Sequence, residues 1–197
     1  MPLVGLTGGM GAGKSTALAT LKQLGAEVLS TDAVVHELYK EQRVRDAITE
    51  RWGPEVAPGG VVDRAAVAQR AFASEQERGW LEGMLWPLVG ERMAQWLQSA
   101  RSLRPPPRAV VVEIPLLFES ELESGFDATI AVIASESLRR ERAGARGHER
   151  EDERISRQLS QEQKAGLATY VVHNDGSENE LHERLREILD ELASKDV

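Results

Sequence analysis

The sequence predicts a three-layer α/β fold with a mainly parallel five-stranded sheet, a helical insertion on the substrate side and a small lid. Apolar, β-branched segments alternate with segments of helical periodicity, which is typical of a parallel sheet covered by helices on both faces. A glycine-rich segment joins the first predicted strand to the first predicted helix. The 197 residues are enough for one sizeable core. We therefore expect one domain with insertions.

The first predicted strand, Leu3–Thr7, leads directly into a phosphate-binding motif. Residues 8–15 read Gly-Gly-Met-Gly-Ala-Gly-Lys-Ser and match G-x-x-x-x-G-K-[ST] at every fixed position. Glycines let backbone N–H groups point at phosphate oxygens, and the next helix directs its positive end at the same anion. The motif lysine reaches the β- and γ-phosphates, and the serine hydroxyl binds Mg²⁺. The alternative is a glycine-rich turn without a ligand.

In this strand–loop–helix context the motif predicts a P-loop NTPase fold. We expect the nucleotide to contact Gly8, Gly9, Gly11, Ala12, Gly13, Lys14, Ser15 and Thr16, with Ser15 as the metal ligand.

The elements after the loop continue the alternation. The pattern predicts a helix from about Ser15 to Leu24, a short strand Glu27–Leu29, and a mainly helical segment from Ala33 to about Trp52. Asp63 is expected to cap a helix that runs through Phe72.

A capping-box pair, Ser74 with Glu77, predicts a long helix that reaches about Arg101. Three further strands are predicted from apolar runs, and Ser177 with Glu180 predicts a final helix. The strands are Ala109–Glu113, Ala128–Ile133 and Tyr170–His173. The domain would then comprise a core at about 1–32, 102–138 and 165–197, an insertion at about 33–101 and a lid at about 139–164.

Two carboxylates follow predicted strands. Asp32 lies just beyond the second strand, and ligands of open α/β sheets bind outside the carboxyl ends of the strands. A carboxylate there can accept a proton from a hydroxyl group or hold Mg²⁺ through water. The alternative role for Asp32 is a helix N-cap. Glu113 ends another strand, and metal binding is a minor interpretation of it.

Arginines are dense between Arg139 and Arg157. Phosphoryl transfer spreads negative charge over the γ-phosphoryl oxygens, and arginines supplied by a lid stabilise that charge. Arg139, Arg142 and Arg146 would share one helix face. The alternative is a solvated helical face with glutamates as ion-pair partners.

Composition excludes several classes of site. The net charge of −8 argues against broad nucleic-acid binding and against docking on anionic membranes. The chain has no cysteine, so it has no disulfide and no thiolate site, and its histidines lack a metal-ligand spacing. We expect a cytoplasmic protein. We also expect a monomer, with a weak oligomer as the alternative.

The order of these motifs resembles that of the dephospho-coenzyme A kinase family across nearly the whole chain. The phosphate-binding motif is common to many families, whereas Ile114-Pro-Leu-Leu-Phe-Glu119 is similar to a distinctive motif of this one. Further matching positions are Asp32, His36, Tyr39, Val62, Asp63, Arg64, Phe72, Leu81, Pro87, Glu141, Arg142, Arg146, Arg154, Gln158, Lys164, Asn174 and Gly176.

The resemblance implies transfer of the ATP γ-phosphoryl group, with Mg²⁺, to the ribose 3′-hydroxyl of dephospho-coenzyme A. It implies that Asp32 is the base, that Lys14 and Arg142 stabilise the transferring group, and that Arg146 and Asn174 also contact ATP. The implied substrate contacts are Thr7, Asp32, His36, Arg64, Pro115, Leu116, Leu117 and Phe118.

Three positions depart from the family pattern. Ser30 replaces its first acid, Trp86 replaces a histidine before the proline, and Gly147 replaces an acid after a lid arginine. Two competing interpretations are another P-loop small-molecule kinase, for a nucleoside monophosphate or shikimate, and a GTP-dependent switch. The switch would normally carry Asn-Lys-x-Asp, which the sequence lacks.

Overall fold

The chain folds into two compact units, and the second unit is inserted between the two segments of the first. A computed structural model describes residues 1–144 and 158–195. The first unit comprises Met1–Ser30 and Gln98–Val197, and the second comprises Thr31–Leu97. The predicted insertion at about 33–101 overlaps the second unit, and the assignment of the whole chain to one domain stays a prediction.

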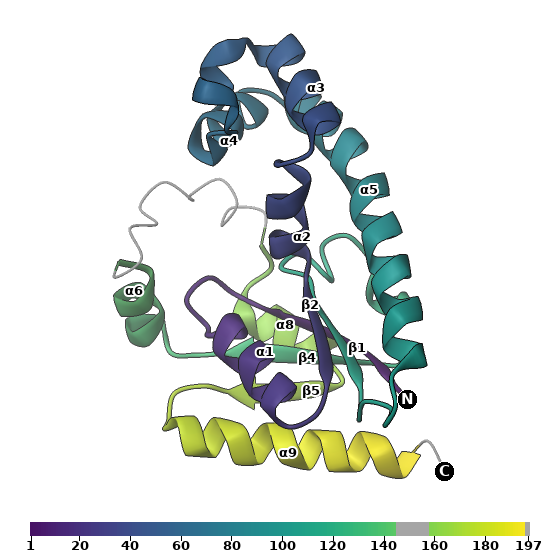
Figure 1. Cartoon of the computed structure of the whole chain (residues 1–197). Helices are drawn as coiled ribbons and strands as arrows, with labels where there is room; N and C mark the ends of the chain where they lie inside the picture. The colour runs from purple at the N-terminus through teal and green to yellow at the C-terminus, as the bar shows by residue number, and fades with distance from the viewer. Residues whose placement is uncertain (145–157, 196–197) are drawn as a thin grey trace. The chain divides into compact units, whose positions relative to one another are not determined.

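A five-stranded sheet forms the centre of the first unit (Figure 1). Its strand order is β2-β3-β1-β4-β5, and all neighbouring strands are parallel. The five predicted strands are confirmed, with ends that shift by at most one residue. The strands are β1 (Leu3–Gly8), β2 (Glu27–Ser30), β3 (Val110–Glu113), β4 (Ala128–Ile133) and β5 (Tyr170–His173).

The central strand β1 lies where the strand order reverses. Leu6 is in register with Glu113 of β3 on one side and with Ile130 of β4 on the other. Ligands of open parallel sheets bind beyond the carboxyl ends of the strands at such a reversal. The phosphate-binding motif follows β1 directly, so the topology puts it at the expected ligand position.

Two helices cover one face of this sheet. They are α1 (Lys14–Gln23) and α9 (Glu178–Lys195), and α9 begins with the predicted capping box. The Glu180 amide donates to Ser177 Oγ at 3.3 Å, and the Ser177 amide donates to Glu180 Oε2 at 3.0 Å. The apolar side chains of this helix that are buried in the main core are Leu181, Leu185, Ile188, Leu189 and Leu192.

The other face of β1 packs closely against the chain that follows β3. A Cβ added to Gly5 would lie 2.9 Å from Leu117 Cδ2, so glycine lets the two segments approach. The short helix α8 (Gln161–Leu167) also contacts β1 and β4. A second capping box, Ser160 with Gln163, starts α8, although this pair is not among those predicted from the sequence. The first unit also contains η3 (Glu123–Gly125) and α6 (Glu136–Gly144).

The second unit is helical. Asp63 caps α4 as predicted, because its Oδ1 accepts from the amides of Ala65 and Ala66 at 2.9 and 3.2 Å. Among the described residues, no helix has the length and apolar character needed to cross a membrane. The elements are α2 (Thr31–Leu38), α3 (Gln42–Trp52), η1 (Pro54–Val56), η2 (Pro58–Gly60), α4 (Arg64–Ala71) and α5 (Glu75–Ser102), whose last residues belong to the first unit.

The predicted capping box of α5 forms only in part. The Glu77 amide donates to Ser74 Oγ at 3.2 Å, but the Glu77 carboxylate accepts from other groups. Arg51 donates to it at 2.7 and 3.0 Å, and Trp52 Nε1 donates at 2.6 Å. The bond from Arg51 lowers the pKa of Glu77 most, followed by the bond from Trp52. The glutamate thereby links α3 to α5 instead of completing the cap.

We predict that Leu185→Ala destabilises the first unit by about 2–5 kcal/mol, because this fully buried leucine packs between α9 and the sheet. Urea unfolding followed by circular dichroism measures the change. Leu167→Ala is the matched control, because Leu167 is 57% exposed and its truncation should cost less than about 0.5 kcal/mol. Equal losses for both variants would contradict the described core.

Candidate active site

The phosphate-binding loop has a backbone that only glycine can supply. Gly11 and Gly13 have φ angles of 72° and 93°. A Cβ on Gly11 would lie 2.5 Å from the Arg139 carbonyl oxygen, and one on Gly13 would lie 2.0 Å from Asn174 Nδ2. Such distances exclude a side chain, so the loop can bring its backbone against an anion, as the motif predicts.

Asn174 anchors the end of the phosphate loop by a hydrogen bond. Its side chain is buried and its Nδ2 donates to the Ala12 carbonyl at 2.8 Å. Arg142 Nη1 donates to the Asn174 carbonyl at 3.2 Å, so the two residues predicted to contact ATP lie side by side next to the loop. The structure therefore brings Arg142 and Asn174 to the nucleotide motif, while their contacts with ATP stay predictions.

Arg139 anchors the middle of the phosphate loop by a hydrogen bond. Its Nε donates to the Met10 carbonyl at 2.9 Å, and its guanidinium lies over Gly9. Lys14 Nζ donates to the Gly9 carbonyl at 3.2 Å. The pattern predicts that Arg139 shares a helix face with Arg142, but it does not predict this contact with the loop. The other arginine of that face, Arg146, lies outside the described residues.

The donor set for a metal ion is small at this site. Ser15 is exposed, which leaves its hydroxyl accessible, and it belongs to the first turn of α1. Within residues 1–144 and 158–195, no group of three or more His, Asp or Glu side chains is arranged to hold a metal. Mg²⁺ in nucleotide sites keeps several waters and is bound through few protein ligands plus substrate phosphates. One serine hydroxyl at a phosphate cradle fits that pattern.

The two strand-end carboxylates have different surroundings. Glu113 is buried and lies in register with Leu6 and Ser30. Asp32 is exposed and lies in the first turn of α2, which begins at Thr31. Asp32 is thus inside the helix and not its N-cap, so the alternative role is wrong. Because Asp32 belongs to the second unit, its catalytic role at the phosphate loop stays a prediction.

The second unit has a small pocket lined by two predicted substrate-binding residues. The pocket has a volume of about 130 Å³, and both His36 and Arg64 line it. Lys40 and Arg45 add two more cationic side chains. Of the residues that line the pocket, none is acidic. The remaining lining residues are Tyr39, Gly60, Val61 and Val62. A small pocket with this charge suits an anionic group of a ligand.

The apolar motif after β3 is partly interior. Leu117 is fully buried and Phe118 nearly so, whereas Pro115 and Leu116 are half-buried. Thr7 is also fully buried, and its hydroxyl donates to the Pro115 carbonyl at 3.2 Å. The structure thus supports packing roles for Thr7, Leu117 and Phe118. Any effect of these three on a substrate would act through the residues they support.

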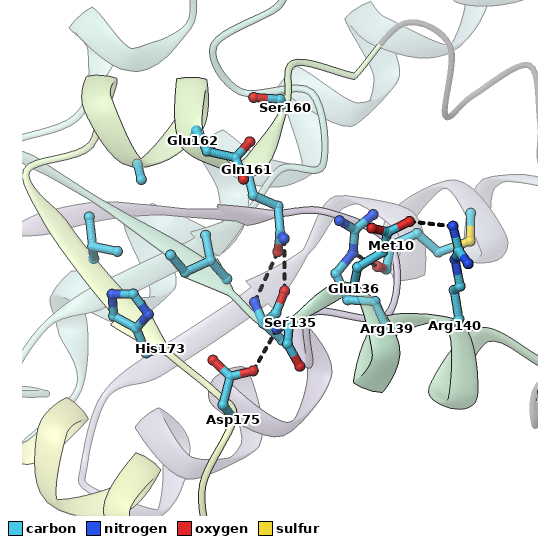
Figure 2. A pocket seen from close by; sticks show the side chains of 14 residues that line it. Met10, Ser135, Glu136, Arg139, Arg140, Ser160, Gln161, Glu162, His173 and Asp175 are labelled. Carbon is cyan, nitrogen blue, oxygen red and sulfur yellow. Dashed lines mark hydrogen bonds and ion pairs between the residues drawn. The ribbon is translucent and has the colours of Figure 1, made fainter.

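A larger pocket of about 980 Å³ lies beside the phosphate loop in the first unit (Figure 2). Met10 and Arg139 connect it to the loop. Figure 2 shows the amide of Gln161 between the backbone groups at the end of β4, where it accepts from the Ala134 amide at 2.9 Å and donates to the Ala134 carbonyl at 2.8 Å. Asp175 accepts from the Ser135 amide, which lowers the pKa of Asp175. These bonds fix one wall of the pocket.

Comparison with known proteins identifies the family. The family model for dephospho-CoA kinase matches residues 2–180. A dephospho-CoA kinase of Deinococcus radiodurans is 41% identical over 96% of this chain and 91% of its own. One of Rhizobium meliloti is 35% identical over 98% of this chain and 100% of its own.

Solved structures agree on the fold. The crystal structure of TT1252 from Thermus thermophilus has a TM-score of 0.79 and 34% identity, with 97% of both chains covered. Dephospho-CoA kinase from Campylobacter jejuni has a TM-score of 0.69 and 20% identity over 99% of this chain and 98% of its own, so it supports the fold alone. The chain therefore belongs to the dephospho-CoA kinase family, the kinases that catalyse the final step of coenzyme A biosynthesis.

Proposed function

We propose that ATP binds at the phosphate loop of the first unit and that its γ-phosphoryl group is transferred to the ribose 3′-hydroxyl of dephospho-coenzyme A. The bond that forms joins the ribose 3′-oxygen of the acceptor to the γ-phosphorus, and the bond that breaks joins the γ-phosphorus to its bridging oxygen. The products are coenzyme A and ADP. The observation that carries this proposal is the family match. It is supported by the phosphate loop at the carboxyl end of β1, which hydrogen bonds from Asn174 and Arg139 hold in place.

The donor side is formed by the loop and the cations beside it. Backbone amides of residues 8–15 bind the phosphates, and Lys14 moves from the Gly9 carbonyl to the β- and γ-phosphates. Arg142 neutralises charge on the transferring group, a role supported by its position next to Asn174. Mg²⁺, when bound to Ser15 and the phosphates, supplies further charge neutralisation.

Asp32 is the proposed base. Asp32 lies in the first turn of α2 and is exposed, so its carboxylate is accessible to a ligand. It would orient the 3′-hydroxyl and accept its proton as the oxygen attacks the γ-phosphorus. Position in the family motif supports this role, and the replacement of the other acid by Ser30 leaves Asp32 as the carboxylate of that motif.

The cationic pocket of the second unit is proposed to bind the diphosphate of dephospho-coenzyme A. Arg64 and Arg45 supply planar donors that suit phosphate oxygens, and Lys40 and His36 add charge. This proposal explains why two residues that the family resemblance marks for the substrate line one pocket. The monomeric state, the cytoplasmic location and the lack of nucleic-acid or membrane partners stay predictions.

A coupled assay of ADP release tests the reaction. The purified chain with ATP and Mg²⁺ should release ADP when dephospho-coenzyme A is added, and mass spectrometry should detect coenzyme A. A nucleoside monophosphate and shikimate serve as control acceptors. Phosphorylation of either one, with dephospho-coenzyme A left unchanged, would refute the proposed acceptor.

We predict that Asp32→Asn lowers kcat by about 10²–10⁴-fold while the Kd for ATP changes little, because the amide cannot accept the proton. Asp46→Asn is the matched control, since Asp46 is an exposed aspartate of the same unit. Lys14→Ala should instead weaken ATP binding and turnover together. Near-normal turnover in Asp32→Asn would remove Asp32 from the mechanism.

We predict that Arg64→Gln raises the KM for dephospho-coenzyme A by about 10-fold or more, because it removes one charge-assisted hydrogen bond to the diphosphate. The KM for ATP should stay within about 2-fold. Arg70→Gln is the control, because Arg70 lies on the same helix, bonds to Glu55 and does not line the pocket. Initial rates at varied concentrations of each substrate distinguish the effects. An equal rise of both KM values would argue against the pocket as the diphosphate site.

A further inference from the structure

Lys164 of α8 is a fully buried cation. Its Nζ lies 2.7 Å from Glu119 Oε1, donates to the Pro115 carbonyl at 2.9 Å and donates to Thr7 Oγ1 at 3.4 Å. A lysine ammonium has three donors, so each of them has an acceptor. Burial of a charge is costly unless it is paired and hydrogen-bonded, and these contacts meet that requirement.

Glu119 is the anionic partner, and its side chain is 10% exposed. Its Oε1 also accepts from the Leu159 amide at 2.8 Å, just before α8. Its Oε2 is buried and has no hydrogen-bond partner among residues 1–144 and 158–195. A buried ion pair is weak evidence for stability, because apolar residues of similar volume often do as well. Positioning is therefore the better explanation of the Lys164–Glu119 pair.

The pair connects two segments that serve the two substrates. Thr7 is the residue before the phosphate loop, and Pro115 begins the apolar motif on the proposed acceptor side. The Thr7 hydroxyl also donates directly to the Pro115 carbonyl at 3.2 Å. Lys164 thus binds the end of β1 and the backbone of the motif with one ammonium group.

The phosphate loop itself has other anchors. Arg139 holds the Met10 carbonyl and Asn174 holds the Ala12 carbonyl, and neither residue belongs to the Lys164 cluster. If Lys164 is lost, the donor side keeps these bonds while the motif at Pro115 loses its charged anchor. The expected defect therefore falls on the acceptor.

We propose that Lys164, paired with Glu119, is a positioning residue for the acceptor, because it fixes the Pro115–Phe118 backbone against the end of β1. This proposal rests on the proposed function for the identity of the acceptor. Lys164 is fully buried and acts through the Pro115 backbone, so it is not a catalytic residue.

The test uses the double variant Lys164→Met with Glu119→Gln, which removes both charges and leaves neither one buried alone. We expect kcat/KM for dephospho-coenzyme A to fall about 10- to 100-fold, since a misplacement of about 1 Å can cost 10²-fold. The Kd for ATP should change less than about 3-fold, and the Tm should stay close to that of the parent. Lys22→Met, an exposed lysine of α1, is the matched control and should change none of these values.

Two results would overturn the proposal. One is a double variant with parental kcat/KM for dephospho-coenzyme A. The other is an equal loss of ATP affinity and acceptor kcat/KM, which would indicate a general structural role. If the double variant does not fold, Thr7→Val tests the proposal instead, because it removes only the hydroxyl that bonds to both Lys164 and the Pro115 carbonyl. That variant should lower the acceptor kcat/KM about 3- to 10-fold with ATP affinity unchanged, and parental kinetics would overturn the proposal.

Hydrogen exchange separates this proposal from the proposed function. The Leu159 amide, which donates to Glu119, should exchange at least about 10-fold faster in the double variant, while amides of β4 keep their protection. If the parent fails to phosphorylate dephospho-coenzyme A, the proposed acceptor is wrong. The exchange rate of the Leu159 amide then tests by itself whether the Lys164–Glu119 pair anchors the segments around it. An unchanged rate in the double variant would refute that anchoring.

Discussion

The phosphate loop keeps its shape because side chains from three separate elements donate to its backbone carbonyls. Lys14 comes from α1, Arg139 from α6 and Asn174 from the chain after β5. The bond from Lys14 comes from within the motif, whereas Gly11 and Gly13 have no room for a Cβ and contribute no side chain. None of the three bonds uses an amide of the loop, and amides are the groups that a phosphate needs. The surrounding fold therefore fixes the loop through its acceptors.

This constraint explains the position of β1 in the sheet. A loop anchored by residues that follow β4 and β5 must follow a strand beside β4, and β1 pairs with β4 as well as with β3. The anchors Arg139 and Asn174 follow β4 and β5, on the same side of the strand order. The parallel arrangement brings the ends of these strands to the edge where the loop begins. The strand order of the sheet therefore determines which residues can anchor the phosphate loop.

Much of the fold could be predicted from the sequence, because its signals are local. The runs Ala128–Ile133 and Tyr170–His173 are mainly apolar, which is typical of buried parallel strands, and both are strands with the predicted bounds. In the part of the chain that the structure describes, the Glu180 carboxylate binds the Ser177 amide and no other group, so the Ser177–Glu180 box forms in full. The Ser74–Glu77 box formed in part because Arg51 and Trp52 bind the same carboxylate, and such competition depends on tertiary contacts.

The predicted site residues follow the same division between local and distant signals. The loop motif can be recognised in eight consecutive residues, whereas Arg139 contacts Met10 across 129 positions and Lys164 contacts Thr7 across 157. No periodicity or short spacing encodes such a pair. A buried lysine is especially hard to predict, because a sequence pattern assigns lysine to the surface by default. Its partner Glu119 was recognised only as part of the motif that resembles the family.

The apolar motif after β3 combines apolar packing with polar bonds to its backbone. Leu117 packs against Gly5, and this contact sets how closely the motif approaches β1. The same approach puts the Pro115 carbonyl within reach of the Thr7 hydroxyl and the Lys164 ammonium. Apolar packing therefore establishes the geometry that the polar bonds require, and the polar bonds fix the direction of the backbone. A motif with a purely apolar attachment could shift along β1, because the hydrophobic effect is non-directional.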